Sequence, residues 1–392
     1  MRDTTSDTTE APTRRDTLKY GSTLVTGSVL AGCSELVGRD NGAEGTNTQG
    51  SYEACIEPVG CLSLEEVPET WMAILGSWAD MAFALGQRDG FRPSGFYCPA
   101  YFYERVGLSM PTDFPALTTE DGYDKEVFYE LDPDVILSDP NYLTGWGSWS
   151  ESDVQELTET VGPFFGNSIL RRMDYNDYTL YSLYEAFERL ADLFQERERY
   201  EAFAAVHDEM QAEIQSRLPP ETERPEIGLV NFGSAPSEGQ FSAMTTESEG
   251  VEMKQYRDFA VQSAFSEAQV GTEIDYETML DIDPEIIILH SGVQLTGEDG
   301  EFSASKFHEE FVAPMEDHVI GRQLTAVAEG NVYPGAYYMQ GPIVNLFQTE
   351  LTAQLLFPDE FGEFDPESYP DLPAAEQLFD RQRVADIIGG ES

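Results

Sequence analysis

The chain has 392 residues, and its 73 aspartates and glutamates outnumber its 22 lysines and arginines to give a formal net charge of −51. This acidity argues against a nucleic-acid-binding protein, because the chain has no basic patch to neutralise phosphates. A hydrophobic fraction of 41% and an aromatic fraction of 12% exclude an acidic disordered tail and predict a folded protein.

The N-terminal residues are similar to an export signal. Arg14 and Arg15 precede a mildly apolar stretch over residues 20–32, which is too short to span a bilayer as a helix and ends in Leu30-Ala31-Gly32-Cys33. The pattern resembles a twin-arginine signal with a lipoprotein box. It implies that residues 1–32 are removed and that Cys33 carries a lipid, which anchors the protein to the extracellular face of the cell membrane.

The segment that follows and the overall charge indicate the surroundings of the protein. Residues 33–52 are polar and are expected to form a flexible tether. A folded domain with this charge repels itself in dilute salt, whereas the Debye length falls to about 3 Å in molar salt. In this respect the chain resembles proteins of extremely halophilic archaea. Cys55 and Cys61 are close enough in sequence to form a small-loop disulfide, which would leave Cys98 unpaired.

The first folded part, expected over residues 53–195, carries alternating strand and helix patterns. We predict a strand at residues 71–75, a turn at 76–78 and a helix at 79–85 that ends at Gly86. Residues 126–137 then contain an Asp-Pro pair followed by aliphatic residues. A helix should end before this proline and a buried strand should follow it.

A long helix is predicted over residues 196–218, because apolar residues recur at helical spacing until Pro219 and Pro220 end the pattern. At 1.5 Å per residue it would be roughly 35 Å long. Such a helix can join two lobes as a stiff strut. The alternative is an ordinary surface helix of one lobe.

The remaining residues, 219–392, repeat the plan of the first part. Residues 277–288 match residues 126–137, with Asp-Pro-Glu followed by aliphatic residues, and further strands are expected at 227–232 and 331–333. The predicted fold is therefore α/β, with two α/β lobes of mainly parallel sheets, a long linking helix and a ligand cleft between the lobes.

This order of elements resembles a known family. The segment Leu131-Asp132-Pro133-Asp134-Val135-Ile136, its counterpart in the second lobe, and residues 328–333 and 351–361 together are similar to ABC-transporter substrate-binding proteins of the iron(III)-siderophore and cobalamin class. The resemblance implies a monomer that is not an enzyme, has no resident cofactor, and delivers its ligand to membrane permease subunits. The chain has no phosphate-binding Gly-rich loop, so the ATPase must be a separate polypeptide.

Ligands of open α/β sheets bind beyond the carboxyl ends of the strands, which nominates the loops at residues 76–78, 94–105, 139–149, 231–237, 290–294 and 333–340. Aromatic rings and phenols suit a bulky iron chelate, and an arginine would balance a net-negative one. The predicted ligand-binding residues are Trp78, Tyr97, Tyr101, Tyr103, Arg105, Tyr142, Trp146, Trp149, Arg257, His290, Tyr337 and Tyr338. The alternatives are core or rim positions for the aromatic residues and a strand-end role for the histidine.

The sequence leaves the ligand open. An iron(III)-siderophore is favoured by the aromatic density and the arginines, while cobalamin, haem and a bare ferric ion held by phenolates and a histidine are alternatives. Four dispersed histidines argue against a zinc or manganese site. A secreted hydrolase is the main competing class, but the chain has neither a Gly-x-Ser-x-Gly nor a His-Glu-x-x-His motif. The β-rich repeats of an adhesion protein are also absent.

Overall fold

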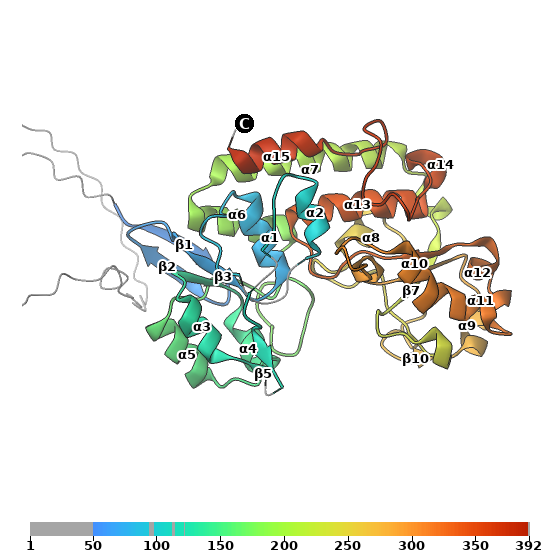
Figure 1. Ribbon diagram of the computed structural model, residues 1–392, viewed down its shortest axis with the longest axis horizontal. Helices are drawn as coiled ribbons and strands as arrows, with labels where there is room; N and C mark the ends of the chain where they lie inside the picture. Colours follow the sequence, from blue (N-terminus) through green and yellow to red (C-terminus); the bar gives the residue numbers. More distant parts are fainter. Residues whose placement is uncertain (1–49, 94–97, 112–113, 121, 391–392) are drawn as a thin grey trace, which may run out of the picture.

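The computed structural model describes residues 50–93, 98–111, 114–120 and 122–390. They form two α/β lobes that lie side by side, with long helices along one side of both (Figure 1). The predicted fold class, two α/β lobes with mainly parallel sheets joined by a long helix, is confirmed. Arg14, Arg15, Cys33 and Tyr97 lie outside the described residues.

The first lobe is built around a short parallel sheet. β3 (Trp71–Ala73) pairs with β6 (Val135–Leu137), and isolated parallel bridges extend the sheet to Phe91 on one edge and Phe164 on the other. Both strands are completely buried, as expected for parallel strands covered on both faces. The other elements of this lobe are β1 (Tyr52–Ile56), β2 (Gly60–Leu64), α1 (Gly76–Ala84), α2 (Ala100–Glu104), β4 (Thr118–Thr119), β5 (Gly122–Tyr123), α3 (Lys125–Leu131), α4 (Pro140–Gly145), α5 (Glu151–Thr160) and α6 (Leu183–Phe194).

Helix α1 differs from the prediction at its start. The sequence predicts a turn over residues 76–78, but the helix begins at Gly76. Every residue of α1 is buried, so tertiary packing outweighs the turn preference of Gly76 and Ser77. The predicted stop is confirmed, because Gly86 follows the helix with φ of +72°.

The second lobe contains a four-stranded parallel sheet in the order β12-β11-β7-β9. Central β11 (Ile286–Leu289) pairs with β7 (Glu226–Val230) and β12 (Val332–Pro334), and β9 (Gln262–Ser263) forms an edge. The other elements after residue 219 are β8 (Phe241–Ser242), α8 (Lys254–Asp258), β10 (Glu273–Ile274), α9 (Tyr276–Ile282), α10 (Ala304–Phe307), α11 (Ala313–Asp317), α12 (Thr325–Glu329), α13 (Pro342–Leu356), α14 (Pro358–Phe361) and α15 (Arg381–Gly389).

The internal repeat has the same structure in both lobes. α3 and α9 each begin after an aspartate whose side chain accepts a backbone hydrogen bond, and each ends at an aspartate in the left-handed region, Asp132 at φ +44° and Asp283 at φ +49°. A proline follows each of these residues and prevents the helix from continuing. Strands β6 and β11 come next, at the positions predicted from the sequence.

Helix α7 (Arg197–Arg217) is the predicted linking helix. Near its start, Arg199 donates to the carbonyl of Leu85 in the first lobe. Near its end, Gln215 Nε2 donates to the carbonyl of Asp258 in the second lobe over 2.8 Å. The helix therefore runs from one lobe to the other, as Figure 1 shows, and is not a surface helix of one lobe.

Two C-terminal helices also connect the lobes. α13 is buried along its whole length and contacts both α1 and α8. At its start, the N–H groups of Ile343 and Val344 donate to Asp80 Oδ2 on α1 over 3.0 and 3.3 Å. α15 packs on α7 and α1. The segment expected as the second lobe, residues 219–392, therefore ends in a helix that contacts the first.

The first described residues form a hairpin in which β1 and β2 are antiparallel. Cys55 lies opposite Cys61, and a disulfide joins them, as the sequence allows. Cys98 is a buried free cysteine whose thiol donates to the carbonyl of Met339. Over the described ranges, no helix is both long and apolar enough to cross a membrane.

Candidate ligand-binding cavity

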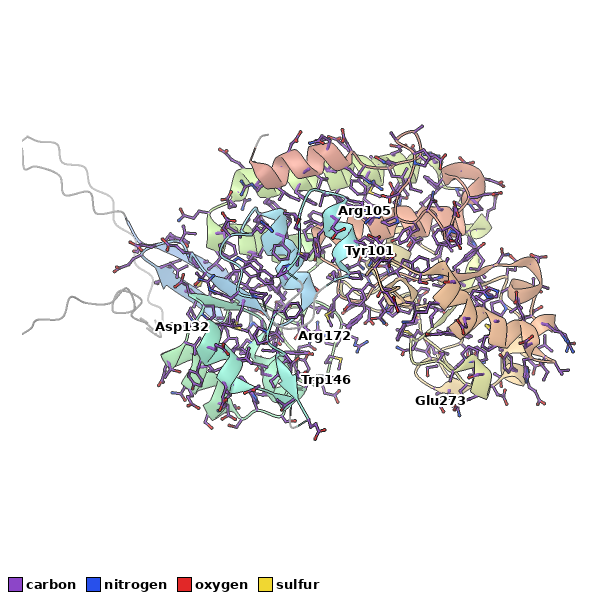
Figure 2. All side chains as sticks on the ribbon, viewed as in Figure 1. Tyr101, Arg105, Asp132, Trp146, Arg172 and Glu273 are labelled. Atoms are coloured by element: carbon purple, nitrogen blue, oxygen red, sulfur yellow. A yellow bond between two sulfur atoms is a disulfide. The ribbon has the colours of Figure 1, made fainter. Side chains whose placement is uncertain are left out.

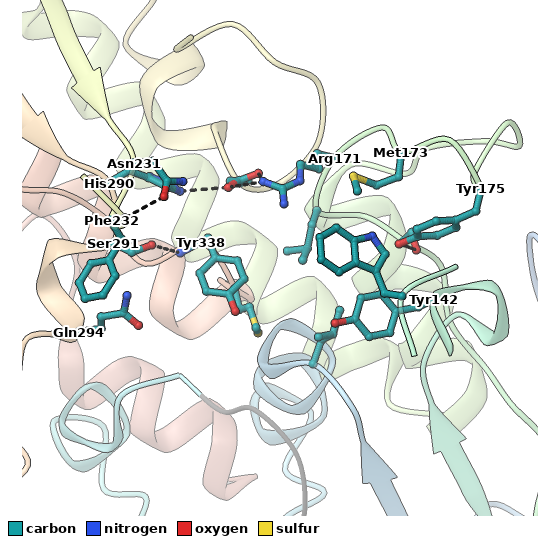
Figure 3. A pocket seen from close by; sticks show the side chains of 17 residues that line it. Tyr142, Arg171, Met173, Tyr175, Asn231, Phe232, His290, Ser291, Gln294 and Tyr338 are labelled. Atoms are coloured by element: carbon teal, nitrogen blue, oxygen red, sulfur yellow. Dashed lines mark hydrogen bonds and ion pairs between the residues drawn. The ribbon is translucent and has the colours of Figure 1, made fainter. Parts of the chain in front are cut away.

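A cavity of about 530 Å³ lies between the lobes, a volume within the range of small-molecule sites. It lies at the carboxyl ends of the parallel strands, because Leu75 closely follows β3 and His290 directly follows β11. Figure 3 shows Tyr142 and Tyr175 on one side and Phe232 on the other. Its lining residues are Leu75, Tyr142, Trp146, Ser168, Leu170, Arg171, Met173, Tyr175, Asn231, Phe232, Gly233, Glu252, His290, Ser291, Gln294, Tyr338 and Met339.

The wall formed by the first lobe is held together by Asp139. Its carboxylate caps α4 by accepting from Asn141 N over 2.9 Å, and it also accepts from Ser168 N over 2.9 Å and from the Tyr178 hydroxyl. Burial raises the pKa of this carboxyl, against the opposing effect of these hydrogen bonds. Asp139 thus fixes α4 next to residues 168–178, and these two segments supply the aromatic side chains of this wall.

Aromatic side chains from both lobes give the cavity apolar surfaces. Trp146 of the first lobe is 59% exposed and Phe232 of the second is 39% exposed, which makes them two of the few large apolar side chains that the described residues leave accessible. Exposed apolar surface on a cavity wall favours binding of an apolar group. Burial raises the pKa of Tyr338 to about 12 and also raises that of Tyr175, so both phenols remain protonated near neutral pH and can donate hydrogen bonds.

A charged group lies at the boundary between the lobes. Arg171 Nη1 is 3.1 and 3.0 Å from the two carboxylate oxygens of Glu252, and His290 Nε2 is 3.2 Å from Glu252 Oε1. Burial of Glu252 would raise its pKa, but the hydrogen bond and the charge of His290, followed by the charge and the hydrogen bond of Arg171, outweigh burial and leave the pKa lowered. Glu252 is therefore ionised near neutral pH. No three His, Cys, Asp or Glu side chains are arranged to hold a metal ion in the described part of the chain.

Four of the predicted ligand-binding residues line this cavity: Tyr142, Trp146, His290 and Tyr338. They come from three of the six loops nominated from the sequence. The loop after β7 contributes as well, through Asn231 and neighbouring residues. The position of each loop at a strand end was therefore more informative than the aromatic content of the loop.

Four predicted aromatic residues are packed elsewhere. Trp78 and Tyr103 are buried in the first-lobe core, where Trp78 Nε1 donates to the carbonyl of Asn167 over 3.2 Å. Trp149 packs against Phe128 with ring centroids 5.2 Å apart. Tyr337 is buried beside Tyr338 but is not part of the cavity lining. Large aromatic side chains near a strand end serve the core as readily as a site, which explains these differences.

The remaining three predicted residues make contacts away from the cavity. Tyr101 donates to the carbonyl of Val293 over 2.9 Å, and Arg105 forms salt bridges of 2.8 Å with Glu301 and with Asp371. Figure 2 shows Tyr101 and Arg105 at α2, well separated from Trp146. Arg257 donates to the backbone carbonyls of residues 248 and 250. These three residues hold segments of the protein together at positions outside the cavity lining.

Sequence reasoning missed the segment that supplies Arg171, Met173 and Tyr175, and it missed Glu252. A signal for the first was present. The apolar residues 161–165 follow helix α5, and Phe164 forms a parallel bridge with Ile136. This segment is therefore an edge of the first sheet, and the residues that follow it lie at the same end as the other loops.

Comparison with known proteins agrees with this architecture. The family model described as periplasmic binding protein matches residues 79–336, which is more than half of the chain. The chain belongs to the periplasmic binding protein family. Members of this family are substrate-binding proteins of transporters. No curated protein matches the sequence.

Several solved structures share the fold at low sequence identity. A periplasmic binding protein from Veillonella parvula is 13% identical over 78% of this chain and 97% of its own, with a TM-score of 0.55. The petrobactin-binding protein YclQ of Bacillus subtilis is 14% identical over 78% and 99%, with a TM-score of 0.52. The siderophore-binding protein BauB is 16% identical over 78% and 99%, with a TM-score of 0.51.

Proposed function

We propose that this periplasmic binding protein captures an iron(III)-siderophore between its lobes and delivers it to the permease of an ABC importer with a separate ATPase. The observation that carries the proposal is the cavity of about 530 Å³ at the carboxyl ends of both sheets, with aromatic side chains from both lobes. The names of two proteins of the same fold, a petrobactin-binding and a siderophore-binding protein, favour an iron chelate as the ligand.

The lining residues suit the chemistry of such a chelate. A ferric siderophore presents an apolar or aromatic periphery around a core of oxygen atoms. Trp146 and Phe232 offer ring faces to the periphery, while the phenol of Tyr338 can donate to the oxygen atoms. The binding is non-covalent and the ligand leaves unchanged, in keeping with a transport protein that is not an enzyme.

Delivery requires that the loaded protein meets its permease at the membrane. In this proposal, lipid on Cys33 holds a monomer at the extracellular face, and residues 33–52 allow the folded part to reach the permease. Because α7 and α13 both contact the two lobes, we expect the ligand to be bound with small movements of the lobes.

Fluorescence titration of the full chain in multimolar KCl tests the proposal. The ligands are a ferric hydroxamate, a ferric catecholate, cobalamin and haemin, with iron-free siderophore as the control. Saturable quenching by a ferric chelate and not by its iron-free form supports the proposal. Quenching by cobalamin or haemin alone would reassign the ligand within the family, and no response to any of them would contradict the proposal.

Substitution of Trp146 locates the binding site. Trp146→Ala should weaken chelate binding about tenfold, because it removes an exposed ring from the cavity wall. Tyr129→Ala is the matched control, since Tyr129 is 40% exposed in the first lobe but does not line the cavity. Calorimetric titration measures both variants. Unchanged affinity in Trp146→Ala would show that the chelate binds elsewhere.

A further inference from the structure

The permanent charges on the cavity wall cancel each other. Arg171 and Glu252 are the residues of the described lining that carry permanent charges, and they form a salt bridge of 3.0 Å. The Glu252 side chain is only 5% exposed and its lowered pKa keeps it ionised, whereas the Arg171 side chain is 43% exposed. The positive charge that a ligand meets at Arg171 is therefore balanced by a negative charge directly behind it.

Neither of the two arginines predicted from the sequence to bind the ligand adds positive charge here. Arg105 is paired with Glu301 and Asp371. Arg257 lines a different cavity of about 730 Å³, where its guanidinium donates to backbone carbonyls. His290 contacts Glu252 and carries charge only when it is protonated.

We propose, on the basis of the function proposed above, that this cavity selects ferric chelates without net negative charge, such as tris-hydroxamates, over trianionic tris-catecholates. On the described lining, a trianionic chelate would meet an arginine whose charge Glu252 already offsets at 3.0 Å, so no uncompensated cation would repay the cost of removing the trianion from water. A neutral chelate meets phenol and amide groups and aromatic rings, which need no net charge to bind it.

High salt does not remove this selectivity. In molar salt the Debye length is about 3 Å, so the charges on the outer surface are screened, but partly buried pairs are screened much less. The pairing of Arg171 with Glu252 therefore still affects the ligand when the total charge of −51 is screened.

Competition between two chelates of different charge tests the inference in the wild-type full chain. The probes are ferrichrome, a neutral tris-hydroxamate, and ferric enterobactin, a trianionic tris-catecholate, measured by calorimetry in multimolar KCl. We expect the neutral chelate to bind more tightly by a factor on the order of ten or more. Equal or tighter binding of the trianion overturns the inference but leaves the proposed function intact. Binding of neither chelate overturns both.

Removing the balancing carboxylate provides a second, independent test. Glu252→Gln keeps the shape of the side chain and leaves the charge of Arg171 uncompensated, so the ratio of trianion to neutral affinity should rise about tenfold. Glu249→Gln is the matched control, because Glu249 lines the other cavity. Should Glu252→Gln fail to fold, Arg171→Gln serves in its place and should lower the same ratio. An unchanged ratio in a folded variant overturns the inference.

Discussion

Asp80 is a buried carboxylate at the boundary between the lobes. It lies fully buried on α1 and accepts the first free N–H groups of α13. Burial raises its pKa to about 7, although the N–H donors lower it in part. A Cβ atom at Gly341 would lie 2.3 Å from Asp80 Oδ2, so this position needs glycine to let the carboxylate approach.

The raised pKa of Asp80 predicts a pH dependence of stability. The unfolded carboxyl ionises near its ordinary value of 3.8, while the folded one keeps its proton up to about pH 7. Between about pH 4 and pH 7 the folded state therefore binds more protons than the unfolded state. As the pH rises through this window, the free energy of unfolding should fall by up to about 4 kcal/mol because of Asp80. Asp80→Asn, which cannot ionise, should abolish that fall.

Chemical unfolding between pH 4 and 8 measures this effect. Asp275→Asn is the control of opposite sign, because the hydrogen bonds from Thr278 lower the pKa of Asp275 and its contribution should be lost as the pH falls. If the free energy of unfolding changed with pH in Asp80→Asn as it does in the wild type, the pH dependence would belong to other groups.

Gly250 provides a second test at the scale of one residue. It has φ of +97°, and a Cβ atom there would lie 2.2 Å from the carbonyl oxygen of Leu170 in the first lobe. Gly271 has φ of +77° but has nothing within 4 Å of the corresponding point. Gly271→Ala should cost about 1–2 kcal/mol from backbone strain alone, and Gly250→Ala should cost more.

Comparing the two glycine variants separates the cost of backbone strain from the cost of the close contact between residue 250 and Leu170. Because Glu252 lies two residues after Gly250 and its N–H donates to the same carbonyl of Leu170, Gly250→Ala should also weaken chelate binding, whereas Gly271→Ala should not. Urea unfolding and calorimetric titration give the two quantities. Equal losses of stability in both variants would show that the close approach to Leu170 contributes nothing.

At the scale of elements, α13 and α15 are joined by a buried ion pair. Glu350 lies inside the protein and binds Arg381 at the start of α15, with Arg381 Nη1 3.0 Å from its Oε1. Burial raises the pKa of Glu350, against the opposing charge of Arg381. The pair connects the helix buried between the lobes to the helix that packs on α7.

Breaking this pair should be costly. Arg381→Met leaves Glu350 buried without its partner and should destabilise the protein by about 3–5 kcal/mol, whereas Glu350→Gln combined with Arg381→Met should cost less. Arg383 lies on the same helix as Arg381 but pairs with the exposed Glu209 of α7, so Arg383→Met should cost much less than Arg381→Met. Denaturant unfolding of the three variants checks this order, and a double variant no more stable than Arg381→Met would refute it.

The elements that could be predicted from sequence are those set by local chemistry. The Asp-Pro pairs end α3 and α9 and place β6 and β11 correctly, and the apolar stripe of α7 gives both its position and its role. The pairing of Phe164 with Ile136 and the packing of α15 on α1 depend on residues far apart in the chain, for which a single sequence carries no local signal.

The same distinction applies to the cavity. Strand-end loops could be nominated because parallel strands place their carboxyl ends together. Whether an arginine in such a loop is available to a ligand depends on the acidic side chains that pair with it. The partners of Arg105 are Glu301 and Asp371, which are far from it in the sequence. The balance between Arg171 and Glu252 likewise arises only after the chain has folded.

At the scale of the whole molecule, the net charge of −51 predicts a requirement for salt. At about 0.1 M salt the Debye length is about 10 Å, so neighbouring surface carboxylates repel one another. Dialysis from multimolar KCl to this concentration should unfold the protein, as followed by circular dichroism. Sucrose, which favours compact states without screening charge, is the control. A folded protein at low salt would remove the argument for a halophilic origin.

Helix α7 also restricts how this protein can change in evolution. A helix turns by about 100° and advances by about 1.5 Å with each residue. Insertion of one residue would therefore rotate the second lobe around the helix axis, and its side of the cavity would no longer face the side formed by the first lobe. Insertion of two full turns would restore the angle but would separate the lobes by about 11 Å. Surface loops can vary in length, whereas α7 must keep both its length and its phase for the two halves of the cavity to meet.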